Sequence, residues 1–178
     1  MTEDTRIVAF LVSAEGIEQS ELTGPWQAVE QAGWKPVLLA PKSGEVQAFH
    51  HLQPGDRFPV DQVVSEADAD AFAGLVLPGG VANGDQLRAH ADAVGFVRDF
   101  VASGKPVAAI CHAIWALVEA DCVRGRRLTS WPSLQTDVRN AGGDWVDEEV
   151  VVDGNIVTSR KPADIPSFNT ELIALVKG

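Results

Sequence analysis

The chain has 178 residues, a length typical of one compact domain, and 46% of them are hydrophobic while 22% are charged. Its 14 Lys and Arg stand against 25 Asp and Glu, which gives a formal net charge of −11. This balance disfavours phosphate backbones and anionic membranes, so we expect neither nucleic acid nor a membrane as a partner. We predict a single domain over residues 1–178, with a core from about residue 7 to residue 176.

The two cysteines and the early apolar run indicate the cellular compartment. Cys111 and Cys122 have a spacing that suits neither a disulfide framework nor a zinc site, so a reducing compartment fits best. Residues 7–12 form an apolar run that is too short for a signal peptide or a transmembrane helix. We therefore predict a cytoplasmic protein, with no metal and no cofactor.

Short apolar runs alternate with helical patterns along the chain, which predicts βαβ units around a mostly parallel sheet. In the first half we expect strands at 7–12, 34–40 and 74–77, helices at 21–32 and 91–103, and a hairpin or irregular excursion at 41–64. In the second half we expect a central strand at 105–110, a helix at 113–120, a short strand near 128, a helix at 132–140, a hairpin at 153–155 and a closing helix at 165–176. The pattern as a whole predicts an α/β fold.

Residues 108–113, Ala-Ala-Ile-Cys-His-Ala, have the form of a nucleophile elbow between a buried strand and a helix. Ala109 and Ala113 are small enough not to collide across such a strained turn. At the amino end of a helix the sulfur of Cys111 faces unpaired N–H groups, which favour the thiolate. Cys111 is therefore the predicted nucleophile, the alternative being a buried structural cysteine. Cys122 lacks these features.

Many separated segments resemble the PfpI-like intracellular protease family, and the resemblance covers about residues 7–176. The matching segments are 75–80 (Leu-Val-Leu-Pro-Gly-Gly), 104–112 (Gly-Lys-Pro-Val-Ala-Ala-Ile-Cys-His), 124–126, 129–132, 141–142, 145–147, 150–155 and 159–160. The family belongs to the superfamily of the Parkinsonism-associated protein deglycase and the class I glutamine amidotransferase-like domains. The resemblance implies a flavodoxin-like three-layer sandwich with the cysteine at its elbow.

The resemblance also implies an acid partner for Cys111. In the family a Glu on the loop after the first strand hydrogen-bonds the reactive sulfur, and this position falls on Glu18. From the residues alone, Glu15 and Glu21 are equal candidates. A protonated carboxyl group there would donate a hydrogen bond to the thiolate and then shuttle a proton.

The Gly-Gly pair and the His beside the nucleophile complete the predicted site. By resemblance, the backbone N–H groups of Gly80 and His112 form an oxyanion hole. In the proteases of the family, the adjacent His belongs to a triad completed by an acidic residue of a neighbouring subunit, and Asp85 is its counterpart here. Because neighbours on a helix point in different directions, proton transfer from Cys111 to His112 requires a special turn geometry.

Three functions remain open from the sequence. The first is a stress-protective deglycase or glyoxalase, in which Cys111 and Glu18 act on reactive aldehydes or early glycation adducts of proteins. The second is an intracellular peptidase that uses a Cys111–His112 pair on peptide substrates. The third is a redox-sensing or chaperone-like protein that uses oxidation of Cys111. The resemblance also implies a homo-oligomer, a dimer or a hexamer, for which an exposed Trp26 would supply contact area.

Overall fold

The structure is a computed structural model that describes residues 6–178, so the first five residues of the predicted domain lie outside the described part. The strands of its main sheet are β1 (Ile7–Leu11), β3 (Lys35–Ala40), β6 (Gln62–Val63), β7 (Gly74–Leu77), β8 (Val107–Ile110), β11 (Val150–Asp153) and β12 (Ile156–Ser159). They lie in the order β11-β12-β8-β7-β1-β3-β6. All neighbours pair in parallel except β11 and β12, which are antiparallel. The predicted mostly parallel α/β sheet is confirmed.

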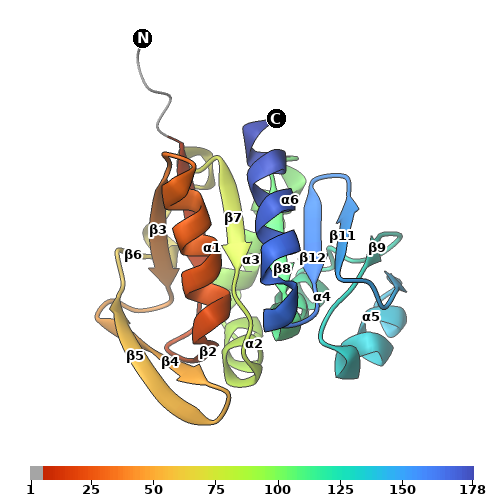
Figure 1. The fold of residues 1–178 in the computed structure, drawn as a ribbon, viewed down its shortest axis with the longest axis horizontal. Helices are drawn as coiled ribbons and strands as arrows, with labels where there is room; N and C mark the ends of the chain where they lie inside the picture. Colours follow the sequence, from red (N-terminus) through yellow and green to blue (C-terminus); the bar gives the residue numbers. More distant parts are fainter. Residues whose placement is uncertain (1–5) are drawn as a thin grey trace.

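Helices cover both faces of this sheet and give three layers (Figure 1). Helices α1 (Gln19–Gln31) and α6 (Ile165–Lys177) lie side by side on one face, and α3 (Ala91–Ala102) and α4 (Ile114–Glu119) lie on the other. Two helices lie outside these pairs, namely α2 (Val81–Arg88) and α5 (Gln135–Asn140). Within residues 6–178, no helix combines the length and the apolar character needed to cross a membrane.

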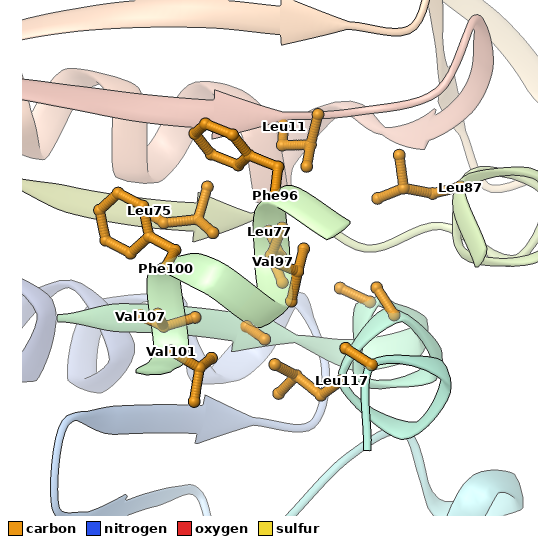
Figure 2. Packing of buried hydrophobic residues seen from close by; sticks show 14 of the residues in the cluster. Leu11, Leu75, Leu77, Leu87, Phe96, Val97, Phe100, Val101, Val107 and Leu117 are labelled. Atoms are coloured by element: carbon orange, nitrogen blue, oxygen red, sulfur yellow. The ribbon is translucent and has the colours of Figure 1, made fainter. Parts of the chain in front are cut away.

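Strand β1 shows why the central strands appear in the sequence as uninterrupted apolar runs. Val8 and Phe10 pack in the cluster beneath α1 and α6, whereas Ala9 and Leu11 pack in the cluster beneath α3 and α4. Successive side chains of a strand point to opposite faces, so a strand buried on both sides needs apolar residues at every position. Figure 2 shows the second cluster, in which Phe100 of α3 lies with other buried side chains of that face.

Three short strands form a second, smaller sheet next to the main one. They are β2 (Glu15–Glu18), β4 (Glu45–His50) and β5 (Gln53–Pro59). For residues 41–64 the sequence predicts a hairpin or an irregular excursion, and β4 and β5 form a hairpin there. β2 pairs in parallel with β4. The stretch expected as a plain loop after β1 is therefore partly a strand. A further parallel pair consists of β9 (Arg127–Leu128) and β10 (Asp144–Trp145).

Helix α2 is absent from the sequence expectations, which give no element between the strand at 74–77 and the helix at 91–103. Its buried residues are Asn83, Gly84 and Leu87, a stripe with only one large apolar side chain, so hydrophobic periodicity does not mark it. Gly84 faces the residue after the nucleophile, and a Cβ there would lie 3.0 Å from the carbonyl carbon of His112. The lack of a side chain at this position lets α2 pack directly on the elbow.

Trp26 does not provide the exposed apolar surface that the sequence suggests. Its ring packs on Phe10 with the centroids 5.0 Å apart, and its indole N–H donates to Glu30 at 3.3 Å. The residue is half-buried against the core beneath α1. Trp26 therefore gives no support to the expectation of an oligomer, which rests on the family resemblance alone.

Candidate active site

Cys111 follows β8 directly, in a 3₁₀ turn over Cys111–Ala113 that leads into α4. Its φ is +64°, the left-handed conformation that is strained for a residue with a side chain. Ala109 and Ala113 are completely buried, which leaves no space for larger side chains at these positions. The predicted nucleophile elbow is present, and it aims the sulfur at the carboxyl-end edge of the sheet, where α/β folds place their sites.

Two backbone amides meet at the sulfur. The N–H groups of Gly80 and His112 both donate to Cys111 Sγ and lower the pKa of the thiol. Gly80 caps the amino end of α2 at a φ of +103°, a conformation that glycine adopts without strain. The structure thus brings together the two amides that the sequence proposes for an oxyanion hole.

His112 contacts the sulfur despite being its direct neighbour. The distance between Cys111 Sγ and His112 Nδ1 is 3.1 Å, so the elbow supplies the special geometry that such a pair requires. The imidazole is held between two indoles, stacked on Trp131 at 5.7 Å and edge-on to Trp115 at 5.2 Å. Burial lowers the pKa of His112 to about 4, so the ring is neutral at physiological pH and can accept a proton.

Glu21 is the carboxyl group beside the sulfur. It lies in the first turn of α1, is completely buried and faces Cys111 and the backbone N–H of Gly79. Among residues 6–178, neither of its oxygens has a hydrogen-bond partner of ordinary geometry. Burial, and second the nearby charge of Glu18, raise the pKa of Glu21 to about 8. The group is therefore protonated at neutral pH and available as a donor.

Glu18, the predicted acid partner, points elsewhere. Its Oε2 accepts a hydrogen bond from the backbone N–H of His51 at 3.1 Å, on the outer side of the site. Strand β2 extends through Glu18 and α1 starts at the next residue, which places Glu21 rather than Glu18 on the buried face of the first turn. The prediction that Glu18 contacts the sulfur is therefore wrong.

A sequence signal for Glu21 did exist. The buried positions of α1 are Glu21, Leu22, Pro25 and Val29. This is the spacing of one apolar stripe on a helix, so the carboxyl group lies among residues that must face the core. A charged residue on an apolar stripe is unusual enough to mark a functional group.

The two glycines after β7 are required for different contacts. A Cβ at Gly79 would lie 2.7 Å from the Cβ of Cys111, so a side chain there would push the elbow away from β7. A Cβ at Gly80 would lie 2.6 Å from the backbone nitrogen of Glu18, at the end of β2. The Gly-Gly pair therefore lets three segments of the site approach one another at van der Waals distance.

Asn83 ties these segments together, and the sequence analysis missed it. Its Oδ1 accepts from the N–H of Ser13 at 2.7 Å, and its Nδ2 donates to the carbonyls of Pro78 at 2.8 Å and Gly79 at 3.1 Å. The side chain is completely buried and fully used. It holds the end of β1 against the end of β7, and nothing in the local pattern of residues 81–85 indicates this role.

The electrostatic setting of Cys111 differs from the expectation of a low thiol pKa. Cys111 is 6% exposed, and burial raises the pKa of its thiol, with an ionised Glu21 raising it further. The two amides oppose this effect but do not overcome it. The sulfur therefore rests as a thiol, and the neutral imidazole of His112 is the base within reach.

A pocket of about 660 Å³ opens in front of the sulfur. Apolar and aromatic side chains supply most of its wall, and the acidic groups come from β2, α1 and α2. The lining residues include Glu15, Glu18, Glu21, His51, Leu52, Val81, Asp85, Cys111, His112, Trp115, Trp131 and Pro162. Asp85 is exposed in this lining, to which His112 also belongs. In the part of the chain that the structure describes, no group of three or more His, Cys, Asp or Glu could hold a metal ion.

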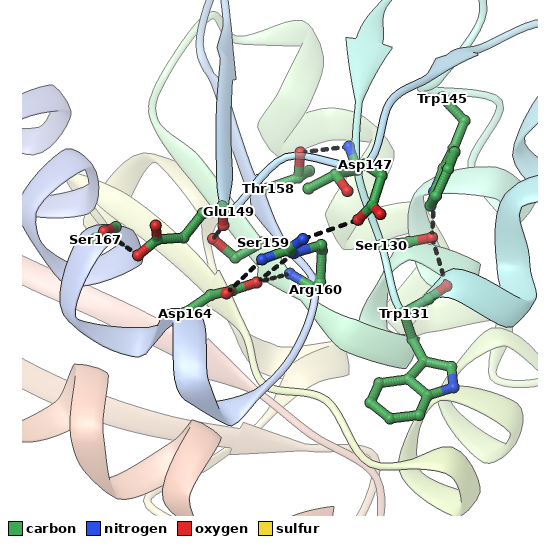
Figure 3. Close-up of polar contacts among 11 residues, drawn as sticks. Ser130, Trp131, Trp145, Asp147, Glu149, Thr158, Ser159, Arg160, Asp164 and Ser167 are labelled. Carbon is green, nitrogen blue, oxygen red and sulfur yellow. Dashed lines mark hydrogen bonds and ion pairs between the residues drawn. The ribbon is translucent and has the colours of Figure 1, made fainter.

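Figure 3 shows hydrogen-bonded side chains around Ser130 and Trp131 and between Asp147, Arg160 and Asp164. Arg160 binds both oxygens of the buried Asp164, at 2.9 and 3.0 Å, and also Asp147 at 2.8 Å. Pro162, which lines the pocket, lies in the turn that the contacts of Arg160 with Asp164 close. Trp131 also lines it, and its backbone N–H donates to the carbonyl of Cys111 at 3.2 Å. The segment that carries Trp131 is therefore fixed to the elbow.

Comparisons with known proteins agree with this geometry. The model of the DJ-1/PfpI family matches residues 6–175. A deglycase of Pyrococcus abyssi is 40% identical over 94% of this chain and 98% of its own length. The putative cysteine protease YraA of Bacillus subtilis is 38% identical over 96% and 98%. The protein/nucleic acid deglycase 2 of Escherichia coli is 39% identical over 95% of this chain and 96% of its own length. Because the name of this relative includes nucleic acid, the expectation that the chain has no nucleic-acid partner is not supported.

Solved structures show the same fold. A two-domain protein of Anabaena variabilis with DJ-1/ThiJ/PfpI-like and ferritin-like domains superposes with a TM-score of 0.89 at 33% identity, over 96% of this chain and 48% of that one. A ThiJ/PfpI domain protein of Brachyspira murdochii superposes with a TM-score of 0.90 at 24% identity, over 97% of each chain. Sequence, fold and relatives agree: the chain belongs to the DJ-1/PfpI family.

Proposed function

We propose that the protein is a stress-protective, cysteine-dependent enzyme that acts on reactive aldehydes or on the early adducts they form with proteins. The observation that carries the proposal is the pairing of Cys111 with the buried, protonated Glu21 at the base of a pocket of about 660 Å³. A pocket of this volume is in the range that encloses whole small-molecule ligands, which leaves space for an adducted side chain. Relatives named deglycases support the same assignment.

The proposed common step is addition of the sulfur to a carbonyl carbon. The S–C bond forms as the C=O π bond breaks, and the thiol proton passes to His112 Nδ1, which lies 3.1 Å from the sulfur. The developing oxyanion is stabilised by the amides of Gly80 and His112, which already converge on the sulfur. Glu21 then gives its proton to the oxygen, which completes a hemithioacetal and leaves a carboxylate able to take a proton back.

Methylglyoxal consumption and release of free amines from methylglyoxal-treated protein test this proposal. We expect the parent protein to perform at least one of these reactions, and Cys111→Ala to abolish it while Cys122→Ser retains it. Casein cleavage on the same samples provides the comparison with proteolysis. Parent protein that leaves both carbonyl substrates unchanged, or Cys111→Ala with full activity, would refute the proposal.

A second candidate function, an intracellular cysteine peptidase, is favoured by one specific contact. Cys111 Sγ and His112 Nδ1 are 3.1 Å apart, and stacking on Trp131 fixes the imidazole. In this reading the acid that orients His112 comes from a neighbouring subunit, with Asp85 as the counterpart position. A relative named as a putative cysteine protease is consistent with it. Peptidase activity that persists in His112→Gln would exclude this arrangement.

A further inference from the structure

We propose that the mouth of the Cys111 pocket selects substrates by charge, so that neutral and cationic carbonyl compounds enter and anionic ones are rejected. The inference rests on the proposed function, because it names the substrate class of the same site. It assigns Glu15, Glu18 and Asp85 as specificity determinants rather than as catalytic residues.

Charge in the pocket is one-sided. Three partly or fully exposed carboxyl groups line it, Glu15 and Glu18 from β2 and Asp85 from α2. None of the Lys or Arg side chains in residues 6–178 is part of the lining. The other ionisable groups there are Glu21, His51, Cys111 and His112, and the two at the base, Glu21 and His112, are neutral at physiological pH.

Two arginines beside lining residues are already engaged with other carboxylates. Arg88 pairs with Glu119 at 3.0 Å and lies over the ring of the lining residue Trp115, 5.7 Å from its centre. Arg160, two residues before the lining residue Pro162, binds Asp147 and the buried Asp164. Neither guanidinium therefore offsets the carboxylates that face the pocket.

The walls of the pocket strengthen the effect of these charges. Leu52 is 89% exposed, Val81 58% and Trp131 38%, so apolar surface surrounds the carboxylates at the entrance. Low-dielectric walls focus the field of charges at the rim of a cleft. The exposed indole of Trp131 can also attract a cation through its ring face.

The base of the pocket is its reacting end. Glu21 lines the pocket, but both of its oxygens are closed to solvent, and the residue faces the thiol of Cys111 and the backbone N–H of Gly79. A ligand therefore meets Cys111 at the base, and the carboxylates at the rim form the recognition end.

Two alkylating reagents of the same shape measure the field at the sulfur directly. Iodoacetamide is neutral and iodoacetate is an anion, and both react with the same thiolate, so the ratio of their rates cancels differences in thiol protonation. The ratio at Cys111 is measured by mass spectrometry at low salt and compared with that of a neutral cysteine peptide. We expect iodoacetate to be disfavoured at Cys111 by roughly tenfold or more relative to the peptide, and added salt to reduce this difference.

Variants identify the carboxylates responsible. Glu18→Gln and Asp85→Asn should each raise the iodoacetate-to-iodoacetamide ratio by about 2–5-fold, and Glu15→Gln provides a third, independent variant if one of these fails to fold. Glu66→Gln removes the same charge from an exposed position outside the pocket and should change the ratio by less than about 1.5-fold. A parent ratio equal to that of the peptide, or an equal shift in Glu66→Gln, would overturn the proposal.

Competing aldehydes link the field to substrate choice and separate the two proposals. We expect neutral methylglyoxal to protect Cys111 from iodoacetamide at a concentration at least about tenfold lower than anionic glyoxylate does, with the gap narrowing in Glu18→Gln and Asp85→Asn. Equal protection by both aldehydes would refute charge selection while leaving aldehyde chemistry intact. No consumption of methylglyoxal or its protein adducts would refute the proposed function, and the alkylation ratio would still decide the question of charge.

Discussion

The two cysteines of the chain flank the same helix, α4, yet their surroundings differ in kind. Cys111 precedes the helix at a φ of +64° and has two amide donors, an imidazole and a buried carboxyl group around its sulfur. Cys122 follows the helix, and its sulfur donates to the carbonyl of Ala120 at 3.4 Å. Burial raises the pKa of both thiols. A shifted pKa alone therefore does not distinguish a reactive cysteine from an inert one.

The difference lies in how many elements of the fold converge on each sulfur. The neighbours of Cys111 come from β8, from the first turn of α1 and from the Gly-Gly turn after β7. The charged groups that influence the thiol of Cys122 are Arg126, Arg98 and Asp121, which act on it through their charge alone, and no imidazole and no pair of backbone amides is among them. We conclude that convergence of an acid, a base and paired amides, rather than burial, marks the site.

Removal of each sulfur should give the largest contrast. Cys111→Ala is expected to lower carbonyl consumption by at least about 100-fold, because the nucleophile is lost. Cys122→Ser should stay within about twofold of the parent. Initial rates with methylglyoxal measure both, and comparable losses in the two variants would contradict the contrast between the sites.

Replacement of each of the two carboxyl groups, Glu21 and Glu18, by an amide should identify the proton donor. Glu21→Gln is nearly isosteric but cannot transfer a proton, so we expect kcat to fall by about 10- to 100-fold, against less than about fivefold for Glu18→Gln on a neutral substrate. In the parent, activity should decline above about pH 8 as Glu21 loses its proton, and this limb should be absent in Glu21→Gln. Rates from pH 6 to pH 10 test this, and an unchanged alkaline limb would exclude Glu21 as the group responsible.

Glu21→Gln, which should lower activity, should make the free energy of unfolding less dependent on pH. The pKa of Glu21 is raised from 4.5 to about 8 on folding, so the folded state holds a proton that the unfolded state releases. Stability is therefore lost as pH rises from about 4.5 to about 8, and the loss reaches about 3 kcal/mol at pH 7. Urea unfolding at pH 5 and pH 7 should show this slope in the parent and a weaker one in Glu21→Gln. Glu18→Gln should weaken the slope slightly, because the charge of Glu18 contributes to the raised pKa of Glu21, whereas Glu66→Gln, an exposed control outside the site, should keep the slope of the parent.

Two glycine substitutions should show the smallest contrast. Gly80→Ala places a Cβ against the end of β2 at a φ of +103°, so we expect a loss of about 1–3 kcal/mol in stability together with reduced activity. Gly95 lies inside α3 with open space around it, so Gly95→Ala should stabilise the protein by about 0.5–1 kcal/mol. Thermal unfolding of both variants checks the signs, and a gain in Gly80→Ala would refute the tight approach at the site.

Local patterns were sufficient to predict the sheet and the elbow. β1, β7 and β8 are short apolar runs ended by turn residues, and the small residues around Cys111 mark its strained turn whatever surrounds them. The sheet and the elbow depend on residues that are close together in the sequence, whereas the role of the Gly80 amide was implied by the family resemblance.

The acid partner and the pKa of the thiol depended on distant contacts. Glu18 lines the pocket without contacting the sulfur because β2 pairs with β4, more than 25 residues away, and so delays the start of α1. Asn83 acquires its role only when β1 and β7 lie side by side. The raised thiol pKa reflects burial by several elements at once. The position of Glu21 on the apolar stripe of α1 was a local signal that it is buried, but no local pattern specifies the contacts of Asn83 or the burial of the thiol.

The pH dependence of Cys111 alkylation by iodoacetamide tests the central claim most directly, namely that Glu21 is the carboxyl group coupled to the sulfur. An ionised Glu21 raises the pKa of the thiol, so Glu21→Gln should lower the pH at which Cys111 becomes reactive, while Glu18→Gln should leave it within a few tenths of the parent value. A shift in Glu18→Gln without one in Glu21→Gln would contradict the account and restore Glu18 as the acid partner.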